Sequence, residues 1–212
     1  MSNPSSTPSN KVTVHVVDDD QSMRTALCRL LGAAGYATRA YASADEVLQA
    51  APQDPACFVL DMMLPGRNGL ELQAAFANWP TPPQVVFVTG HGNVASTVRA
   101  MQAGAVDVLT KPVHREHLVS AVDRALVRSE RAGAERRQQQ LWRERHASLT
   151  ERETEVFEHV VRGAMNKQIA HALDMAERTV KAHRAQVMEK MQAGSLAELV
   201  RMAQQLPPFE TA

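Results

Sequence analysis

The chain of 212 residues has little that would cross-link it or anchor it in a membrane. It contains only two cysteines, Cys28 and Cys57, too few for a disulfide framework, and both are expected to be small buried hydrophobic residues. No apolar run approaches the ~18 residues that a membrane span needs. Residues 1–10 lack the basic start and hydrophobic stretch of a signal peptide. These absences favour a cytoplasmic protein with no membrane partner.

Net charge is absent as well, because 23 basic residues balance 23 acidic ones. The part up to Val127 is slightly acidic and the remainder slightly basic. So weak a division is poor evidence for a nucleic-acid partner, and that conclusion has to depend on motifs.

Short apolar runs alternate with helical patterns from residue 11 to about 127. This pattern predicts strands at 12–17, 36–40, 56–60, 84–88 and 106–109, and helices at 20–34, 43–51, 69–78, 93–103 and 115–127. Five strands, each followed by a helix, predict an α/β domain with a doubly wound, five-stranded parallel sheet that is covered on both faces.

The segment 128–147 is rich in Arg, Glu and Gln. It is predicted to be a solvated helical linker that continues the fifth helix. A dimer stalk resembling a coiled coil, formed by Ala132, Leu141 and Trp142, is the alternative, but the segment lacks the three or four heptads that such a stalk requires.

The segment 148–206 has helical patterns and no strand pattern. Helices are predicted from Thr150 to about Arg162, from Lys167 to Leu173 with Asn166 as cap, from Glu177 to Met191, and from Leu196 to Leu206. The second and third are separated by a short turn and have helix-turn-helix proportions, which predicts an all-α four-helix domain. Residues 1–10 and 207–212 are expected to be tails.

Polar side chains stand at the ends of four predicted strands. Asp18 and Asp19 close the first, Asp61 the third and Thr89 the fourth, while Lys111 follows the last. The carboxyl ends of parallel strands converge on one crevice, where doubly wound folds bind ligands. Three carboxylates, a hydroxyl and a lysine in that crevice predict a site for Mg²⁺ and a phosphoryl group.

These motifs resemble a known family. Val16–Asp20, Leu60–Gly66, Thr89–Gly92 and Lys111–Pro112, in this order, look like the receiver domain of two-component response regulators. Residues 149–206 resemble helix-turn-helix domains of the LuxR/NarL type through Leu149–Glu153, Gly163–Ala170 and Arg178–Arg184. The chain beyond its first residues is thus similar to the FixJ-like and StyR-like regulators, which implies a flavodoxin-like strand order in the sheet.

The resemblance assigns roles in the crevice. It implies that Asp61 is the phospho-acceptor, and that Asp19 and Asp61 bind Mg²⁺ directly together with the backbone carbonyl of Met63. Asp18 would act largely through water. Lys111 would pair with the phosphoryl oxygens. The resemblance also implies that the peptide bond between Lys111 and Pro112 is cis, which would place the amine in the crevice.

The resemblance also implies that Thr89 turns its hydroxyl onto the phosphoryl group. The chain differs from many receivers at Val108, where they have an aromatic residue that moves together with the threonine. The conformational change that follows phosphorylation is therefore expected to be smaller or to use other residues. His91 and Met63 occupy positions that flank the path of the hydrolytic water in receivers, and His91 is therefore expected to affect the lifetime of the phosphorylated state.

In the output domain the resemblance implies DNA contacts by the third helix. Lys181, Ala182 and Ala185 occupy positions that meet base edges, with Lys181 the main candidate. Phosphate contacts are assigned to Arg178, Thr179, His183 and Arg184, and to Asn166 and Lys167 at a helix N-terminus. Ala176 stands where relatives often have a capping Ser or Thr, which should cost about 1 kcal/mol of local helix stability.

The most consistent interpretation is a transcription factor switched by phosphorylation, not an enzyme. A sensor histidine kinase would phosphorylate Asp61, and the receiver would dimerise through its fourth helix and last strand, around Arg99, Met101 and Val108. The dimer would bind double-stranded promoter DNA, with RNA polymerase as a further partner. The last helix, through Leu196, Leu199, Val200 and Ala203, could form a second dimer face or pack inward.

Two alternatives stay open. The receiver could be a dimerisation scaffold in a regulator that works without phosphorylation, although the complete set of polar residues argues against this. A HAD-like phosphotransferase also uses an aspartyl nucleophile, but it would need a second acid where Met63 stands. An ATP-driven activator is excluded, because the chain has no Gly-rich Lys-Ser/Thr loop.

Overall fold

The computed structural model describes residues 12–53, 56–90 and 94–206, so the predicted tails and His91 lie outside the described residues. The chain divides into two compact units, residues 1–133 and 134–212. No helix among the described residues has the length and apolar character that crossing a membrane requires.

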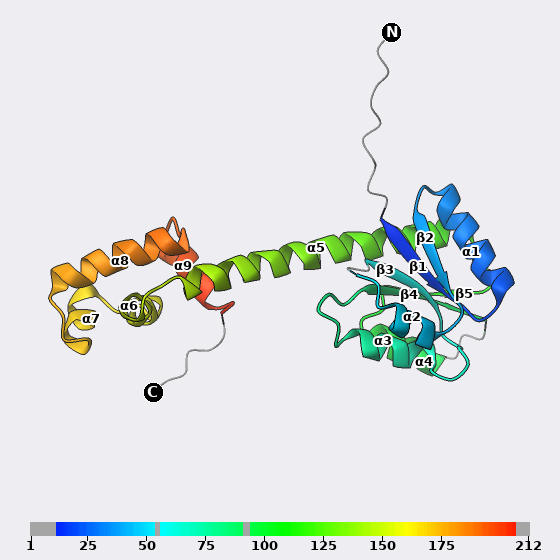
Figure 1. Ribbon diagram of the computed structural model, residues 1–212, viewed down its shortest axis with the longest axis horizontal. Coiled ribbons are helices and arrows are strands. Elements are labelled where there is room, and N and C mark those ends of the chain that lie inside the picture. The colour runs from blue at the N-terminus through cyan, green and yellow to red at the C-terminus, as the bar shows by residue number, and fades with distance from the viewer. Residues whose placement is uncertain (1–11, 54–55, 91–93, 207–212) are drawn as a thin grey trace, which may run out of the picture. The chain divides into compact units, whose positions relative to one another are not determined.

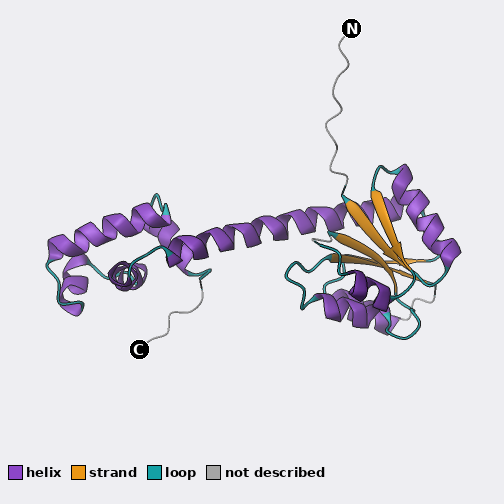
Figure 2. Ribbon diagram, in the orientation of Figure 1, coloured by secondary structure: helices purple, strands orange, loops and turns teal. Residues whose placement is uncertain are grey.

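The first unit contains a parallel five-stranded sheet (Figure 2). Its strands are β1 (Thr13–Val17), β2 (Ala37–Tyr41), β3 (Cys57–Asp61), β4 (Gln84–Thr89) and β5 (Asp107–Thr110). Their order in the sheet is β2-β1-β3-β4-β5, which confirms the predicted fold class and strand order. Because the chain moves from β1 to β2 on one side and later to β3 on the other, the topological switch point lies between β1 and β3.

Helices cover both faces of this sheet (Figure 1). They are α1 (Gln21–Ala33), α2 (Ala44–Ala50), α3 (Gly69–Phe76), α4 (Val94–Gln102) and α5 (Arg115–Ala147). α5 continues without a break through the segment predicted as a helical linker, while the domain boundaries at 127 and 147 remain predictions.

The alternation of side chains along the strands explains the two layers. Val14 and Val16 of β1 pack with Leu27 of α1 and Leu118 of α5, whereas Val17 packs in a separate cluster with side chains of α2, α3 and α4. Successive residues of a strand point to opposite faces, so a strand buried on both faces is apolar throughout. This is why the central strands appear in the sequence as continuous hydrophobic runs.

The second unit has its own core. α6 (Glu151–Val161), α7 (Asn166–Ala172), α8 (Glu177–Met191) and α9 (Leu196–Ala203) bury a cluster that includes Phe157, Ile169, Val187 and Leu199. Trp142 from the end of α5 packs against the same cluster. The coiled-coil alternative placed Trp142 on a dimer seam, and its packing inside this unit weighs against that role.

The structure defines how three helices begin. Asp20 is the N-cap of α1 and accepts hydrogen bonds from the backbone N–H groups of Ser22 and Met23. Ala176 is the N-cap of α8 and makes no side-chain cap, as expected. Thr150 caps α6 in a reciprocal capping box with Glu153.

One buried titratable group lies within the sheet. His15 is 4% exposed, its Nδ1 is 3.0 Å from the hydroxyl oxygen of Tyr41, and its ring stacks on Phe58 with centroids 4.7 Å apart. Burial, and secondly the charge of Arg39, lower the pKa of His15 to about 4. The imidazole is therefore neutral in the folded chain at neutral pH.

A pH-dependent loss of stability follows. An imidazole with an ordinary pKa of 6.5 in the unfolded chain takes up a proton before folded His15 does. The free energy of unfolding should then fall as the pH drops from 6.5 to about 4, by up to about 3 kcal/mol from this group. The free energy of unfolding is measured at each pH by urea titration, followed by Trp79 fluorescence in a Trp142→Phe background. In this assay His15→Gln should make the free energy of unfolding depend less on pH between 6.5 and about 4. An unchanged slope would contradict the assignment.

Candidate functional site

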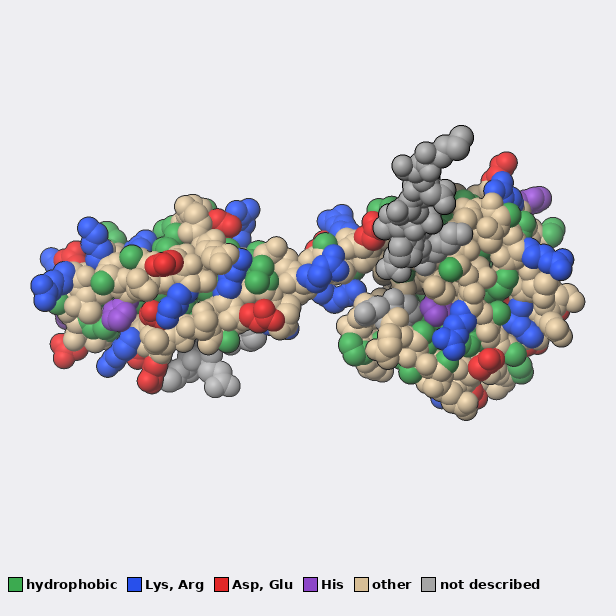
Figure 3. Space-filling view, turned by 45° about the horizontal axis from the view of Figure 1, so that its top comes forward, with side chains coloured by type: hydrophobic (Ala, Val, Ile, Leu, Met, Phe, Trp, Pro, Cys, Tyr) green, Lys and Arg blue, Asp and Glu red, His purple; other side chains and the backbone are tan. Residues whose placement is uncertain are grey.

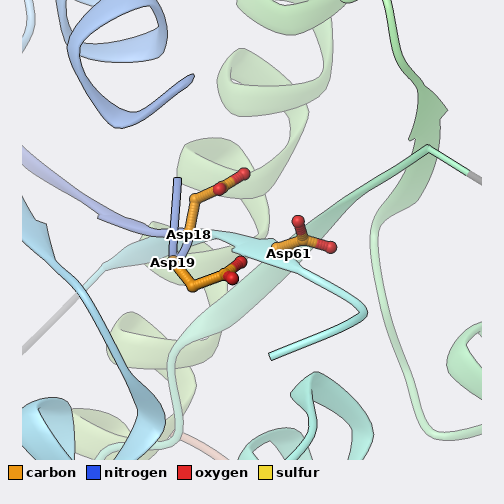
Figure 4. A group of neighbouring side chains, drawn as sticks. All are labelled: Asp18, Asp19 and Asp61. Carbon is orange, nitrogen blue, oxygen red and sulfur yellow. The ribbon is translucent and has the colours of Figure 1, made fainter. Parts of the chain in front are cut away.

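Three carboxylates meet at the switch point of the sheet. Asp18 and Asp19 directly follow β1, and Asp61 is the last residue of β3, the strand paired with β1. Each has a carboxylate oxygen within 4.8 Å of the others (Figure 4). Asp18 and Asp61 are buried and Asp19 is exposed, so the cluster is open to solvent on one side.

Lys111 joins two of these carboxylates. Its Nζ lies 2.8 Å from Oδ2 of Asp18 and 2.6 Å from Oδ2 of Asp61, and the peptide bond to Pro112 is cis, as expected. Burial raises the pKa of Asp18 although its bond to Lys111 opposes this. Burial alone would lower the pKa of Lys111, but the hydrogen bonds to both carboxylates raise it overall. The lysine is therefore protonated and positively charged in the crevice.

The second oxygen of Asp61 is held by the chain that follows it. The backbone N–H of Met63 donates to Oδ1 of Asp61 at 2.8 Å, while the Met63 side chain is 70% exposed. Both oxygens of Asp61 therefore have a donor, one from the backbone and one from Lys111. Coordination of a metal by the carbonyl of Met63 remains a prediction.

Thr89 ends β4 and is fully buried. Its carbonyl oxygen accepts a hydrogen bond of 2.8 Å from the backbone N–H of Lys111. The hydroxyl of Thr89 and the ammonium of Lys111 thus lie at the ends of two neighbouring strands, β4 and β5, which this backbone hydrogen bond joins. Val108, the departure from the aromatic pattern, is half-buried in β5 and packs against the core of the α2–α4 face.

Gly69 at the start of α3 has a role that no sequence motif indicated. A Cβ built on Gly69 would lie 2.4 Å from the backbone oxygen of Asp61 and 3.0 Å from a ring carbon of Phe87. The helix therefore approaches the backbone of the predicted phospho-acceptor closely enough to exclude any side chain. The sequence offered only a glycine at the first position of a predicted helix, which also fits an ordinary helix start.

The donor set fits Mg²⁺. Carboxylate oxygens are hard ligands, and Mg²⁺ is held in proteins by one or two carboxylates while it keeps several waters. The half-open cluster offers Asp61 and Asp19 as ligands, with solvent access beside Asp19. Lys111 offsets only part of the negative charge of three carboxylates, which also favours a cation here.

The second unit presents the residues expected at DNA on α7 and α8. Lys167, Arg178, Lys181, Ala182 and Ala185 are exposed, while Asn166, Thr179, His183 and Arg184 are half-buried. Val180, Val187 and Met191 are buried in the core on the opposite side of α8. Acidic and basic side chains lie intermixed on the face of this unit drawn in Figure 3.

Asn166 is not the cap that was expected. Met165 occupies the N-cap position of α7, and Asn166 is the first helical residue. Its Oδ1 accepts a hydrogen bond of 3.1 Å from Nη1 of Arg184 on α8. The amide therefore links the two helices of the helix-turn-helix, because its side chain faces α8 and not the free N–H groups of its own helix.

The possible second dimer face on α9 is divided. Leu199 is fully buried in the core of its own unit, whereas Leu196 is 40% exposed. Val200 and Ala203 are half-buried, and Ala203 packs against that core. Inward packing is thus confirmed for Leu199, and Leu196 is the most exposed of these four residues.

The close approach at Gly69 can be tested by substitution. Gly69→Ala places a methyl group against the backbone oxygen of Asp61, so the free energy of unfolding of the first unit should fall by about 1–3 kcal/mol. Gly32→Ala is the matched control, because a Cβ there has nothing within 4 Å and alanine favours the helix. Urea unfolding with the Trp79 signal should separate the two variants. Equal stability would contradict the steric argument.

Comparison with known proteins agrees with this geometry. The family model of the response regulator receiver domain matches residues 14–123, and that of the bacterial regulatory proteins of the luxR family matches residues 147–203. The chain is 42% identical over 199 residues to nodulation protein W of Bradyrhizobium diazoefficiens, covering 93% of this chain and 88% of that protein. It is 42% identical over 191 residues to the transcriptional regulatory protein FixJ of Azorhizobium caulinodans, covering 90% of each.

Solved structures support the same assignment. The structure of the response regulator StyR superposes with a TM-score of 0.77 at 40% identity, covering 92% of this chain and all of the other. Full-length FixJ from B. japonicum gives a TM-score of 0.56 at 39% identity, covering 92% of this chain and 97% of the other. The chain therefore belongs to the FixJ-like response regulators, transcriptional regulators rather than enzymes, in which a receiver domain is joined to a luxR-family DNA-binding domain.

Proposed function

We propose that Asp61 accepts a phosphoryl group from a sensor histidine kinase, and that the phosphorylated chain dimerises and binds promoter DNA through α8. The observation that carries this proposal is the contact of Lys111 with both Asp18 and Asp61 at the carboxyl edge of the sheet. A carboxylate nucleophile needs its own negative charge and that of the incoming group neutralised, and the crevice supplies a lysine for this purpose.

The residues of the crevice divide the work. As an oxygen of Asp61 forms its bond to phosphorus, the P–N bond of the donor phosphoimidazole breaks and its electron pair leaves with the imidazole nitrogen. The Met63 amide orients the attacking carboxylate, and Lys111 follows the transferred oxygens as a mobile point charge. Asp18, Asp19 and Asp61 would hold Mg²⁺, which supplies neutralisation of the charge on the phosphoryl oxygens.

The readout would start at Thr89, whose hydroxyl is assigned to the phosphoryl group. β4 leads from this residue towards α4, where Val94, Val98 and Met101 are exposed. Their spacing places them on one side of the helix, next to the exposed Arg99. We assign the phosphorylation-dependent dimer contact to this side of α4. Val108, the third residue expected at the dimer contact, is half-buried against the core and offers less surface to a partner than the exposed residues of α4 do.

Dimerisation would act on DNA affinity through effective concentration. Two helix-turn-helix units held together bind a two-fold site far more tightly than either alone. The exposed first half of α8 offers Lys181 for base edges and Arg178 for phosphates, while α7 presents Lys167. RNA polymerase is assigned as a partner of the DNA-bound dimer.

Phosphorylation is tested with acetyl phosphate and Mg²⁺. The wild type should gain one phosphoryl group by intact mass and shift to a dimer by sedimentation, and Asp61→Asn should do neither. Without an adduct in the wild type, the receiver would have to be a scaffold that works without phosphorylation. An adduct without dimerisation would overturn the assignment of α4.

DNA recognition is tested with two lysines that have different assigned roles. On a selected operator, Lys181→Ala should reduce affinity by about 1–3 kcal/mol and relax the sequence preference at one position. Lys167→Ala should weaken binding to all sequences alike and make the salt dependence shallower by about one phosphate contact. If Lys181→Ala keeps the full sequence preference in binding titrations, that lysine does not read a base.

A further inference from the structure

Arg24 on α1 contacts the backbone of both acids that follow β1. Its Nη1 lies 2.7 Å from the carbonyl oxygen of Asp18 and 2.8 Å from that of Asp19. The side chain is half-buried and its own backbone lies in the first turns of the helix. A single guanidinium nitrogen therefore bridges two successive carbonyl groups in the turn that presents the acidic pair.

These two carbonyls lie beyond the regular sheet. The ladder of β1 ends at Val17, which is in register with Tyr41 on one side and Leu60 on the other. Carbonyl groups past the end of a ladder need another donor, and a charged donor makes a stronger bond than a neutral one. Arg24 supplies that donor from the adjoining helix.

The direction of the two carboxylates depends on the same turn. The peptide group is planar, so holding both carbonyls fixes the two peptide planes that flank the Cα of Asp19 and restricts the backbone from which the side chains of Asp18 and Asp19 leave. The other bonds of the turn act in the same sense, since Oδ1 of Asp18 accepts from the N–H of Asp20 at 2.9 Å. Asp20 in turn caps α1, the helix that carries Arg24.

We propose that Arg24 is a positioning residue of the receiver: by holding the carbonyls of Asp18 and Asp19, it keeps their carboxylates in the orientation that binds Mg²⁺ and thereby raises the affinity for the cation. This inference rests on the proposed function of the crevice. Arg24 acts through the two acids and takes no part in phosphoryl transfer itself.

The sign of the effect separates this role from simple electrostatics. A nearby positive charge by itself repels Mg²⁺, so loss of that charge alone would strengthen binding. Loss of the hydrogen bonds from Arg24 to the two carbonyls weakens Mg²⁺ binding, because the freed carboxylates must then be ordered when the cation binds. Arg24→Ala removes both the charge and the hydrogen bonds to the two carbonyls, whereas Arg24→Lys keeps the charge on a shorter side chain that does not place a donor where Nη1 lies.

The experiment measures Mg²⁺ affinity of the full-length, unphosphorylated protein by calorimetric titration. Arg24→Ala should weaken Mg²⁺ binding by about tenfold, the lower end of the range for groups that orient metal ligands. Arg24→Lys should fall between this variant and the wild type. Phosphorylation by acetyl phosphate, which needs no docked kinase, should require correspondingly more Mg²⁺ and recover at saturation.

Arg29→Ala is the matched control, since Arg29 is an exposed arginine of the same helix. It should leave Mg²⁺ affinity unchanged. Melting temperatures without Mg²⁺ are measured in parallel: a variant Arg24→Ala that is less stable but binds Mg²⁺ as the wild type does would overturn the proposal, as would tighter binding. If Arg24→Ala does not fold, Arg24→Lys is used in its place: weaker Mg²⁺ binding than in the wild type supports the proposal, and equal or tighter binding overturns it. A wild type that binds no Mg²⁺ would overturn the proposed function of the crevice and this inference with it.

Discussion

The contact of one lysine with two carboxylates is the interaction on which the proposed function of this chain depends. Asp18, Asp61 and Lys111 follow or end three different strands, and they meet only because those strands run parallel in the order β2-β1-β3-β4-β5. Buried carboxylates at this spacing repel one another and are costly to desolvate, so a cation among them stabilises the arrangement. The negative charge that Lys111 leaves uncompensated fits a cation such as Mg²⁺, and under the proposed mechanism the lysine and that cation together offset the charge of the phosphoryl group.

The surroundings of the crevice limit how Asp61 can be placed. Gly69 allows the start of α3 to lie against the backbone of Asp61, and the Met63 amide holds one oxygen of its carboxylate. On the other side of the sheet edge, Arg24 holds the chain that carries Asp18. Under the proposed mechanism the reacting groups are therefore positioned by backbone and helix contacts before the donor arrives, so less of the binding energy is spent on ordering them. A backbone hydrogen bond from Lys111 to Thr89 joins the ends of β5 and β4 at the same edge of the sheet.

The DNA-binding unit depends on a different kind of contact. Its helix-turn-helix is fixed by an apolar core and by the hydrogen bond between Arg184 and Asn166, two residues that the sequence suggested for phosphate binding. An arginine engaged with an amide keeps donors that can still meet a phosphate, because guanidinium has five N–H groups. The part of α8 that is proposed to contact base edges has few polar groups, because two of its three residues are alanines. Ala182 and Ala185 lie with Lys181 on the exposed side of the helix.

Local pattern determined the fold class and the position of each polar residue at a strand end, whereas the strand order was expected only from the family resemblance. The first two follow from the sequence because strand burial, helix periodicity and turn residues act over a few neighbours. The tertiary structure alone decided the close approach of Gly69 to Asp61, the bridge from Arg24 to the carbonyls of Asp18 and Asp19, and the contact that draws Asn166 away from capping. It also placed Leu199 of α9 in the core. Each of these depends on how two elements pack together, and no spacing along a single chain segment contains that information.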